Sequence, residues 1–299
     1  RPNTEFLADS GLEMFKGTLL VDGDMRTNDP DIYAVGDCAL VTNRVTGQRQ
    51  WSAMGSTANI TGRLAATRIA GETGPSYPGV LGTGVAKLPG VSMGRTGLTE
   101  AAAKKAGFNV ETIVVAADDK AHYYPGSEKM MMKLICDRDT HKLLGMQALG
   151  NWAVDKMTDI AVTAISMGAA LEELQSCDFA YAPPFSTAIH PFAVAVNALL
   201  NKLSGKLESF TPAQYAAGEA EDYTMLDVSI QPAFQNVPHI QLNQVNGRLE
   251  GYPVDEKLLL VCSTGKRTYL LQNRLKHFGY TNTRILEGGV LFNTQLQGR

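Results

Sequence analysis

The pattern of apolar and polar residues divides the chain into three sections that predict different elements. In the first section, apolar runs at residues 17–21 and 32–35 predict short strands, each followed by a turn that contains Gly and Asp. Residues 56–70 carry apolar side chains at helical spacing and predict an amphipathic helix. Residues 71–79 are rich in Gly, Pro and Ser, so they predict the end of this section.

The second section mixes strands and helices. Residues 110–115 predict a strand, and the apolar runs 130–136 and 143–149 flank a polar turn, which indicates a β-hairpin. Residues 154–167 and 191–203 have apolar side chains at helical spacing. This section is therefore predicted to be an α+β domain.

The third section begins after a polar stretch. Short apolar strands at residues 225–228 and 257–261 precede a helix over residues 270–278, and this order predicts a small α/β unit. Together the three sections predict a multidomain protein of the α/β and α+β classes. The predicted domains are residues 1–75, 76–205 and 223–299, and residues 206–222 are predicted to be a linker.

Composition narrows the class of protein. The 299 residues are 44% hydrophobic and 19% charged with a net charge of −3, which indicates a soluble globular protein and provides no basic field for nucleic acid or anionic membranes. No apolar run is long enough to span a bilayer, and no signal peptide opens the chain. The four cysteines form neither a CxxC pair nor a disulfide framework. We expect a cytoplasmic protein without a metal site.

Residues 27–37, Thr-Asn-Asp-Pro-Asp-Ile-Tyr-Ala-Val-Gly-Asp, carry the first strong motif. A glycine at the end of a strand allows a ligand to approach the backbone, and the following aspartate accepts hydrogen bonds from sugar or polyol hydroxyls. The run resembles the second FAD-binding motif of the pyridine nucleotide-disulfide oxidoreductase family. This resemblance implies that Gly36 and Asp37 bind FAD, with Asp37 on the ribityl chain.

Two neighbouring segments support the same resemblance. Residues 1–7 resemble the family segment in which the chain re-enters the FAD domain, so residues 1–75 are interpreted as the remnant of a Rossmann-like FAD-binding domain. Residues 52–63 are similar to the helix start that faces the flavin, which implies contacts from Met54, Gly55 and Ala58. Amide groups at a helix N-terminus favour the negative charge of a reduced flavin.

The second section resembles the dimerisation domain of this family. The motifs His122-Tyr123-Tyr124-Pro125-Gly126 and Ala180-Tyr181-Ala182-Pro183-Pro184-Phe185-Ser186 resemble those of coenzyme A-disulfide reductases and their NADH oxidase relatives. The resemblance implies a homodimer in which Tyr123 and Tyr181 reach the partner's active site and bond to a thiolate or substrate sulfur. The alternative is that both are interface tyrosines. His190 resembles the acid–base histidine of related disulfide reductases only weakly and is interpreted as a helix-start or interface histidine, and His122 is a similarly weak acid–base candidate.

The last motif is Cys262-Ser263-Thr264-Gly265-Lys266-Arg267-Thr268. A strand ends at Cys262, and a six-residue loop is predicted to lead into a helix, so that amides and the two cations could stabilise a thiolate or persulfide. The motif resembles the active-site loop of a rhodanese domain, and residues 287–290 resemble its closing segment. Ser229 and the short passage 236–240 depart from the rhodanese pattern, so an abbreviated rhodanese-like domain, with a buried Cys262 as the alternative, is expected.

The order of these three sections resembles the fusion form of coenzyme A-disulfide reductase. It implies FAD as cofactor, NADH or NADPH as reductant, and coenzyme A disulfide, persulfide or polysulfide as substrate. The alternatives are a water-forming NADH oxidase and a module that only dimerises and carries sulfur. The chain opens with Arg and contains neither a GxGxxG motif nor a flavin-proximal cysteine, so we expect a fragment of a longer protein.

Overall fold

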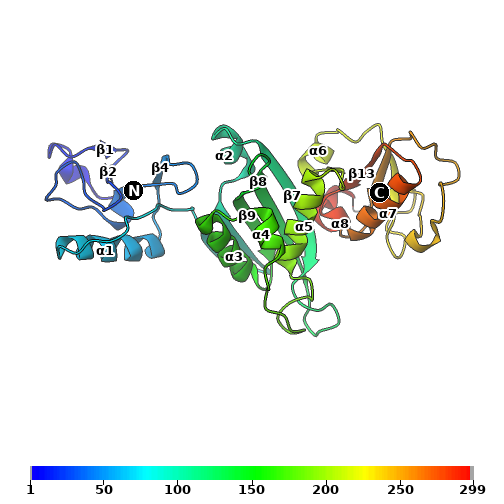
Figure 1. The fold of residues 1–299 in the computed structure, drawn as a ribbon, viewed down its shortest axis with the longest axis horizontal. Helices are drawn as coiled ribbons and strands as arrows, with labels where there is room; N and C mark the ends of the chain where they lie inside the picture. Colours follow the sequence, from blue (N-terminus) through cyan, green and yellow to red (C-terminus); the bar gives the residue numbers. More distant parts are fainter. Residues whose placement is uncertain (1, 297–299) are drawn as a thin grey trace. The chain divides into compact units, whose positions relative to one another are not determined.

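The computed structural model describes residues 2–296, and the chain divides into two compact units, residues 1–83 and 84–299 (Figure 1). The predicted boundary after residue 75 is therefore too early. Val80 returns to the first unit, where its amide donates to the carbonyl of Thr42 (2.8 Å) and its carbonyl accepts from the amide of Arg44 (2.9 Å). These backbone bonds hold residues 76–83 in the first unit.

The first unit contains a four-stranded sheet and one long helix. The strands lie in the order β1 (Met14–Phe15), β2 (Thr18–Leu20), β3 (Ala39–Thr42) and β4 (Arg49–Trp51), and the helix is α1 (Gly55–Ile69). Two 3₁₀ turns, η1 (Glu5–Leu7) and η2 (Gly36–Cys38), complete the unit. Its core is formed by small and aliphatic side chains, namely Leu19, Val21, Met25, Ala34, Ala39, Val41, Ala65 and Val80.

The strand predicted over residues 32–35 is wrong. The structure has an isolated bridge between Arg26 and Tyr33 in place of a ladder. Residues 25–27 and 32–34 exchange two backbone bonds, from the amide of Ala34 to the carbonyl of Met25 and from the amide of Thr27 to the carbonyl of Ile32, both 3.0 Å long. The segment is too short and too tightly turned for a regular strand.

The second unit begins with an antiparallel sheet of five strands. Their order is β5 (Gly84–Leu88), β6 (Val91–Gly97), β9 (Leu143–Gly150), β8 (Lys129–Asp137) and β7 (Val110–Asp118). The helices are α2 (Glu100–Lys105), α3 (Val154–Met167), α4 (Leu171–Gln175) and α5 (Pro191–Leu203). Helix α3 packs on β6 and β9, and α5 packs on β7 and β8 (Figure 1). The predicted hairpin is confirmed as β8–β9.

The same unit continues into a parallel sheet with the order β10 (Ser209–Phe210), β13 (Thr283–Leu286), β12 (Leu258–Val261) and β11 (Thr224–Asp227). Around it lie α6 (Pro212–Ala216), η3 (Leu242–Gln244), α7 (Lys266–His277), α8 (Gly289–Phe292) and η4 (Thr294–Leu296). Residues 206–222 are therefore not a linker. Phe210 is buried in the core of this sheet, edge-on to Tyr223, and the burial of this side chain holds β10 in the sheet.

None of the helices within residues 2–296 is long and apolar enough to cross a membrane.

Candidate functional site

The predicted FAD-binding residues gather around the first turn of α1. Gly36 is buried and has a φ of +70°, a conformation that favours glycine. Its amide donates to Oγ1 of Thr61 (3.3 Å), and a Cβ at this position would lie 3.4 Å from the Cβ of Ala58. The turn η2 therefore rests directly on the helix, and its middle residue, Asp37, lies at the surface.

The N-terminus of α1 is open to a ligand. Met54 caps the helix without a side-chain hydrogen bond, no acidic residue lies in the first turn, and both Met54 and Gly55 are exposed. The backbone carbonyl of Asp37 accepts a hydrogen bond from Nε1 of Trp51 (2.7 Å), which fixes the backbone beside this turn. A helix N-terminus without a capping side chain favours an anionic group.

Tyr123 and Tyr181 lie on two loops that contact each other. The amide of Ala121 donates to the carbonyl of Pro183 (3.2 Å), and both loops project from the same end of the five-stranded sheet (Figure 1). Tyr123 and Tyr181 are 67% and 51% exposed. Two phenol groups on adjacent loops are therefore accessible to another molecule.

His190 begins α5, as predicted for a helix-start histidine. Its Nδ1 accepts a hydrogen bond from the amide of Phe192 (3.2 Å), and its ring stacks on Phe179 with 4.5 Å between centroids. Burial, with the charge of Lys156 as a smaller cause, lowers the pKa of His190 to about 4. His190 is thus neutral near pH 7. His122 is exposed and packs edge-on against Tyr123.

Cys262 directly follows β12, and three residues separate it from the start of α7. Its side chain is buried, with a residue exposure of 1%, and Sγ accepts a hydrogen bond from the amide of Gly265 (3.2 Å). Oγ1 of Thr268 donates to the carbonyl of Gly265 (2.6 Å) and closes the first turn of the helix. The side chain of Cys262 is therefore buried in this structure.

The loop after Cys262 is shorter than predicted. Helix α7 begins at Lys266, so Ser263, Thr264 and Gly265 are the whole loop, in place of the six residues expected. Lys266 is exposed, and Nε of Arg267 donates to the carbonyl of Val228 (2.7 Å). The guanidinium therefore supports the neighbouring loop after β11, which differs from the predicted role beside the sulfur.

Sequence reasoning missed the residue that organises this neighbouring loop. Asp227 is fully buried at the end of β11, and its carboxylate accepts hydrogen bonds from the amides of Ser229 (2.9 Å) and Ala233 (2.6 Å). An aspartate at the end of an apolar strand is the only signal the sequence offers for this role.

Two family models match the chain. The pyridine nucleotide-disulphide oxidoreductase model matches residues 1–63, and the model of the dimerisation domain of pyridine nucleotide-disulphide oxidoreductases matches residues 88–193. The chain belongs to the pyridine nucleotide-disulphide oxidoreductase family. Members of this family depend on FAD and use NAD(P)H as reductant.

Three relatives show which members of the family this chain is similar to. The NAD(P)H sulfur oxidoreductase (CoA-dependent) of Pyrococcus furiosus is 35% identical over 67% of this chain and 45% of its own length. The NADH oxidase of Methanocaldococcus jannaschii is 35% identical over 69% and 46%. A solved structure of a NAD-dependent persulfide reductase from A. fulgidus superposes on this chain with a TM-score of 0.90 and 34% sequence identity. The superposition covers 98% of this chain and 54% of the reductase chain. The chain spans about half the length of these curated relatives.

The residues around α1 fit FAD. The φ of +70° at Gly36 would strain any other residue, so a glycine is needed to form the turn that rests on Ala58. The exposed, uncapped amides at Gly55 suit the negative edge of a reduced flavin, and Asp37 at the adjacent surface suits hydroxyl groups.

Proposed function

We propose that the complete protein reduces coenzyme A disulfide, persulfide or polysulfide with NAD(P)H and FAD, and that residues 223–299 form an abbreviated rhodanese-like domain that carries sulfur on Cys262. The observation that supports this proposal is the position of Cys262 at the carboxyl end of a parallel strand, in a short loop that leads into a helix. The similarity to the A. fulgidus persulfide reductase covers 98% of the chain and thus includes this domain.

The first unit and the two tyrosine loops take separate roles in this proposal. Asp37 and the N-terminus of α1 hold FAD, which when bound supplies two-electron transfer between NAD(P)H and sulfur. The complete protein is a homodimer. Tyr123 and Tyr181 are exposed, so their hydroxyls can donate hydrogen bonds to a thiolate or substrate sulfur in the partner's active site.

The sulfur step at Cys262 is a thiol exchange. The Cys262 thiolate attacks the outer sulfur of a persulfide R–S–SH, the S–S bond breaks, R–S⁻ leaves, and Cys262 holds a persulfide. A hydride equivalent from NAD(P)H and a proton from solvent then convert this persulfide to the thiol and hydrogen sulfide. Because Cys262 is buried, the loop 263–265 opens to admit the substrate.

An NADH oxidase is the second candidate, because the M. jannaschii relative with that name is 35% identical to this chain. That relative matches 69% of the chain, whereas the persulfide reductase structure from A. fulgidus matches 98% of it and so includes the domain that carries Cys262, which favours the sulfur reductase. A module that dimerises and holds sulfur without turnover is the third candidate.

One assay of the complete protein separates these candidates. Anaerobic NADH and NADPH oxidation is measured with coenzyme A disulfide, coenzyme A persulfide and polysulfide, and separately with oxygen alone. The proposal expects rapid turnover with a sulfur substrate, together with sulfide or thiol release. Turnover with oxygen alone would show that the protein is an NADH oxidase. No turnover of flavin-loaded protein with any acceptor would favour the module that dimerises and holds sulfur.

A further inference from the structure

A buried carboxylate joins the parallel sheet to the edge of the five-stranded sheet. Glu287 follows β13, and its side chain is 0% exposed. Oε2 accepts a hydrogen bond from the amide of Val114 (2.9 Å) in the edge strand β7, and Oε1 accepts from Nζ of Lys202 (2.6 Å) and from Oγ of Ser209 (2.7 Å). Glu287 thus contacts β7, α5 and β10 at once.

Lys202 completes this junction from α5. Its Nζ donates to the carbonyl of Thr112 in β7 (2.9 Å) and forms ion pairs with Glu287 and with Glu111 (3.1 Å). Burial alone would lower the pKa of Lys202, but the two carboxylates more than offset this and raise it. The Thr112 carbonyl and the carboxylates of Glu287 and Glu111 provide one acceptor for each of the three hydrogens of the Lys202 ammonium group. All hydrogen-bond donors of Lys202 therefore have a partner.

The segment that carries Glu287 also holds the Cys262 loop. The amide of Val290 donates to the carbonyl of Cys262 (3.0 Å), and the amide of Leu291 donates to the carbonyl of Ser263 (3.1 Å). Gly289 lies so close that a Cβ would be 2.4 Å from the carbonyl oxygen of Cys262. Only two residues, Gly288 and Gly289, therefore separate Glu287 from the amide bonded to Cys262.

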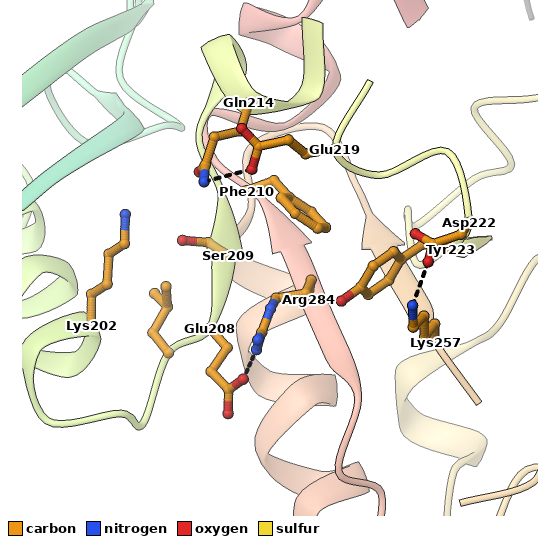
Figure 2. Close-up of a pocket in the computed structure, with 11 residues that line it drawn as sticks. Lys202, Glu208, Ser209, Phe210, Gln214, Glu219, Asp222, Tyr223, Lys257 and Arg284 are labelled. Carbon is orange, nitrogen blue, oxygen red and sulfur yellow. Dashed lines mark hydrogen bonds and ion pairs between the residues drawn. The ribbon is translucent and has the colours of Figure 1, made fainter. Parts of the chain in front are cut away.

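A pocket of about 510 Å³ lies beside this junction (Figure 2). Lys202 and Ser209 line it, so water in the pocket is adjacent to the pair. Three cationic side chains and three carboxylates line the pocket, and two ion pairs, Glu208–Arg284 and Asp222–Lys257, lie among them. The charges therefore balance, and the lining favours neither an anionic nor a cationic ligand.

We propose that Lys202 and Glu287 are positioning residues, which hold the Cys262 loop in place against the edge of the five-stranded sheet. The inference rests on the proposed function, because the position of Cys262 matters for activity only if Cys262 carries sulfur. A buried ion pair that loses one partner leaves an uncompensated charge, so the structure around the other partner loosens. Loosening of Glu287 then reaches Cys262 through residues 288–291.

The test is the alkylation rate of Cys262 by iodoacetamide in the complete protein, resolved by peptide mass spectrometry. Lys202→Met should accelerate alkylation of Cys262 about tenfold or more, since the buried Glu287 carboxylate is left unpaired, and the conservative Lys202→Arg should restore most of the protection. Lys257→Met is the matched control, because it breaks an ion pair of the same domain at the surface. Exposed Cys177 and buried Cys136 are internal references in every sample.

Unchanged alkylation of Cys262 in Lys202→Met would overturn the proposal, and so would an equal acceleration at Cys136 or in Lys257→Met, which would indicate general loosening. If Lys202→Met does not fold, Glu287→Gln is measured against the same references. The readout does not depend on sulfur transfer. A Cys262 that never forms a persulfide, with the alkylation result as expected, would remove the proposed function and leave the structural coupling intact.

Discussion

Replacing Gly289 by Ala should selectively open the Cys262 loop. Gly289 has a φ of +59°, and a Cβ would lie 2.4 Å and 2.5 Å from the carbonyl oxygens of Cys262 and Ser263. These atoms belong to the backbone, so they cannot move aside as a flexible side chain would. The substitution therefore combines a strained backbone with a steric clash at the residue that is proposed to carry sulfur.

The magnitude follows from these two contributions. A non-glycine residue in the left-handed region costs about 1–2 kcal/mol, and forcing a methyl group into a packed site costs about 1–3 kcal/mol more. The sum is about 2–5 kcal/mol. Since 1.4 kcal/mol is roughly a factor of ten in an equilibrium constant, the opening equilibrium that exposes Cys262 should shift by roughly 30-fold or more.

Two other glycines of the same domain separate the contributions. Gly251 also has a positive φ (+80°) but nothing within 4 Å of the added Cβ, and Gly247 has neither constraint. Alkylation of Cys262 under native conditions, resolved by peptide mass spectrometry, measures the opening in each variant. Gly251→Ala should show at most the backbone cost, and Gly247→Ala should match the wild type. A rate for Gly289→Ala within about threefold of Gly251→Ala would refute the clash argument, because a difference that small is under 1 kcal/mol.

Three further predictions concern the other sites. Asp37→Ala should weaken FAD retention by roughly ten- to hundredfold, measured by flavin occupancy after dilution; full occupancy would remove the assignment. Tyr181→Phe should lower kcat about tenfold with the same flavin content and dimer mass, while Tyr124→Phe, a neighbour of the proposed Tyr123 site, should not. The pKa of His190 is lowered to about 4 by burial first, so the unfolded chain binds the proton more readily. Stability should then fall as the pH drops from about 6.5 towards 4, and urea unfolding of His190→Asn should lack this fall.

Strong local patterns predicted much of the fold. The apolar runs around residues 137–140 became the β8–β9 hairpin, and helical spacing gave α1, α3 and α5 within a residue or two of their observed ends. These elements follow from side-chain periodicity, which the sequence contains in full.

The errors have a different physical origin. Strand β10 has two residues and exists because its neighbours bond to β13, from the amide of Ile285 to the carbonyl of Glu208 and from the amide of Glu287 to the carbonyl of Phe210. No local pattern specifies such a tertiary pairing. Residues 206–222 therefore read as a linker.

The candidate site shows the same division. Its residue types are present in the sequence, but the burial of Cys262 depends on amides of residues 290 and 291, and the direction of Arg267 depends on the carbonyl of Val228. Lys202 carries no sequence signal, because its role arises from a helix meeting the end of a distant strand.

The most direct test of the account is to load Cys262 with sulfur and then reduce it. The complete, FAD-loaded protein is treated anaerobically with polysulfide, freed of excess reagent, and analysed by mass at Cys262 before and after one equivalent of NADH or NADPH. The account predicts an adduct of one sulfur atom (about 32 Da, one atom transferred), which disappears with oxidation of the nucleotide and release of one sulfide. No adduct in folded, reduced protein, or an adduct that persists while the nucleotide is oxidised, would contradict it.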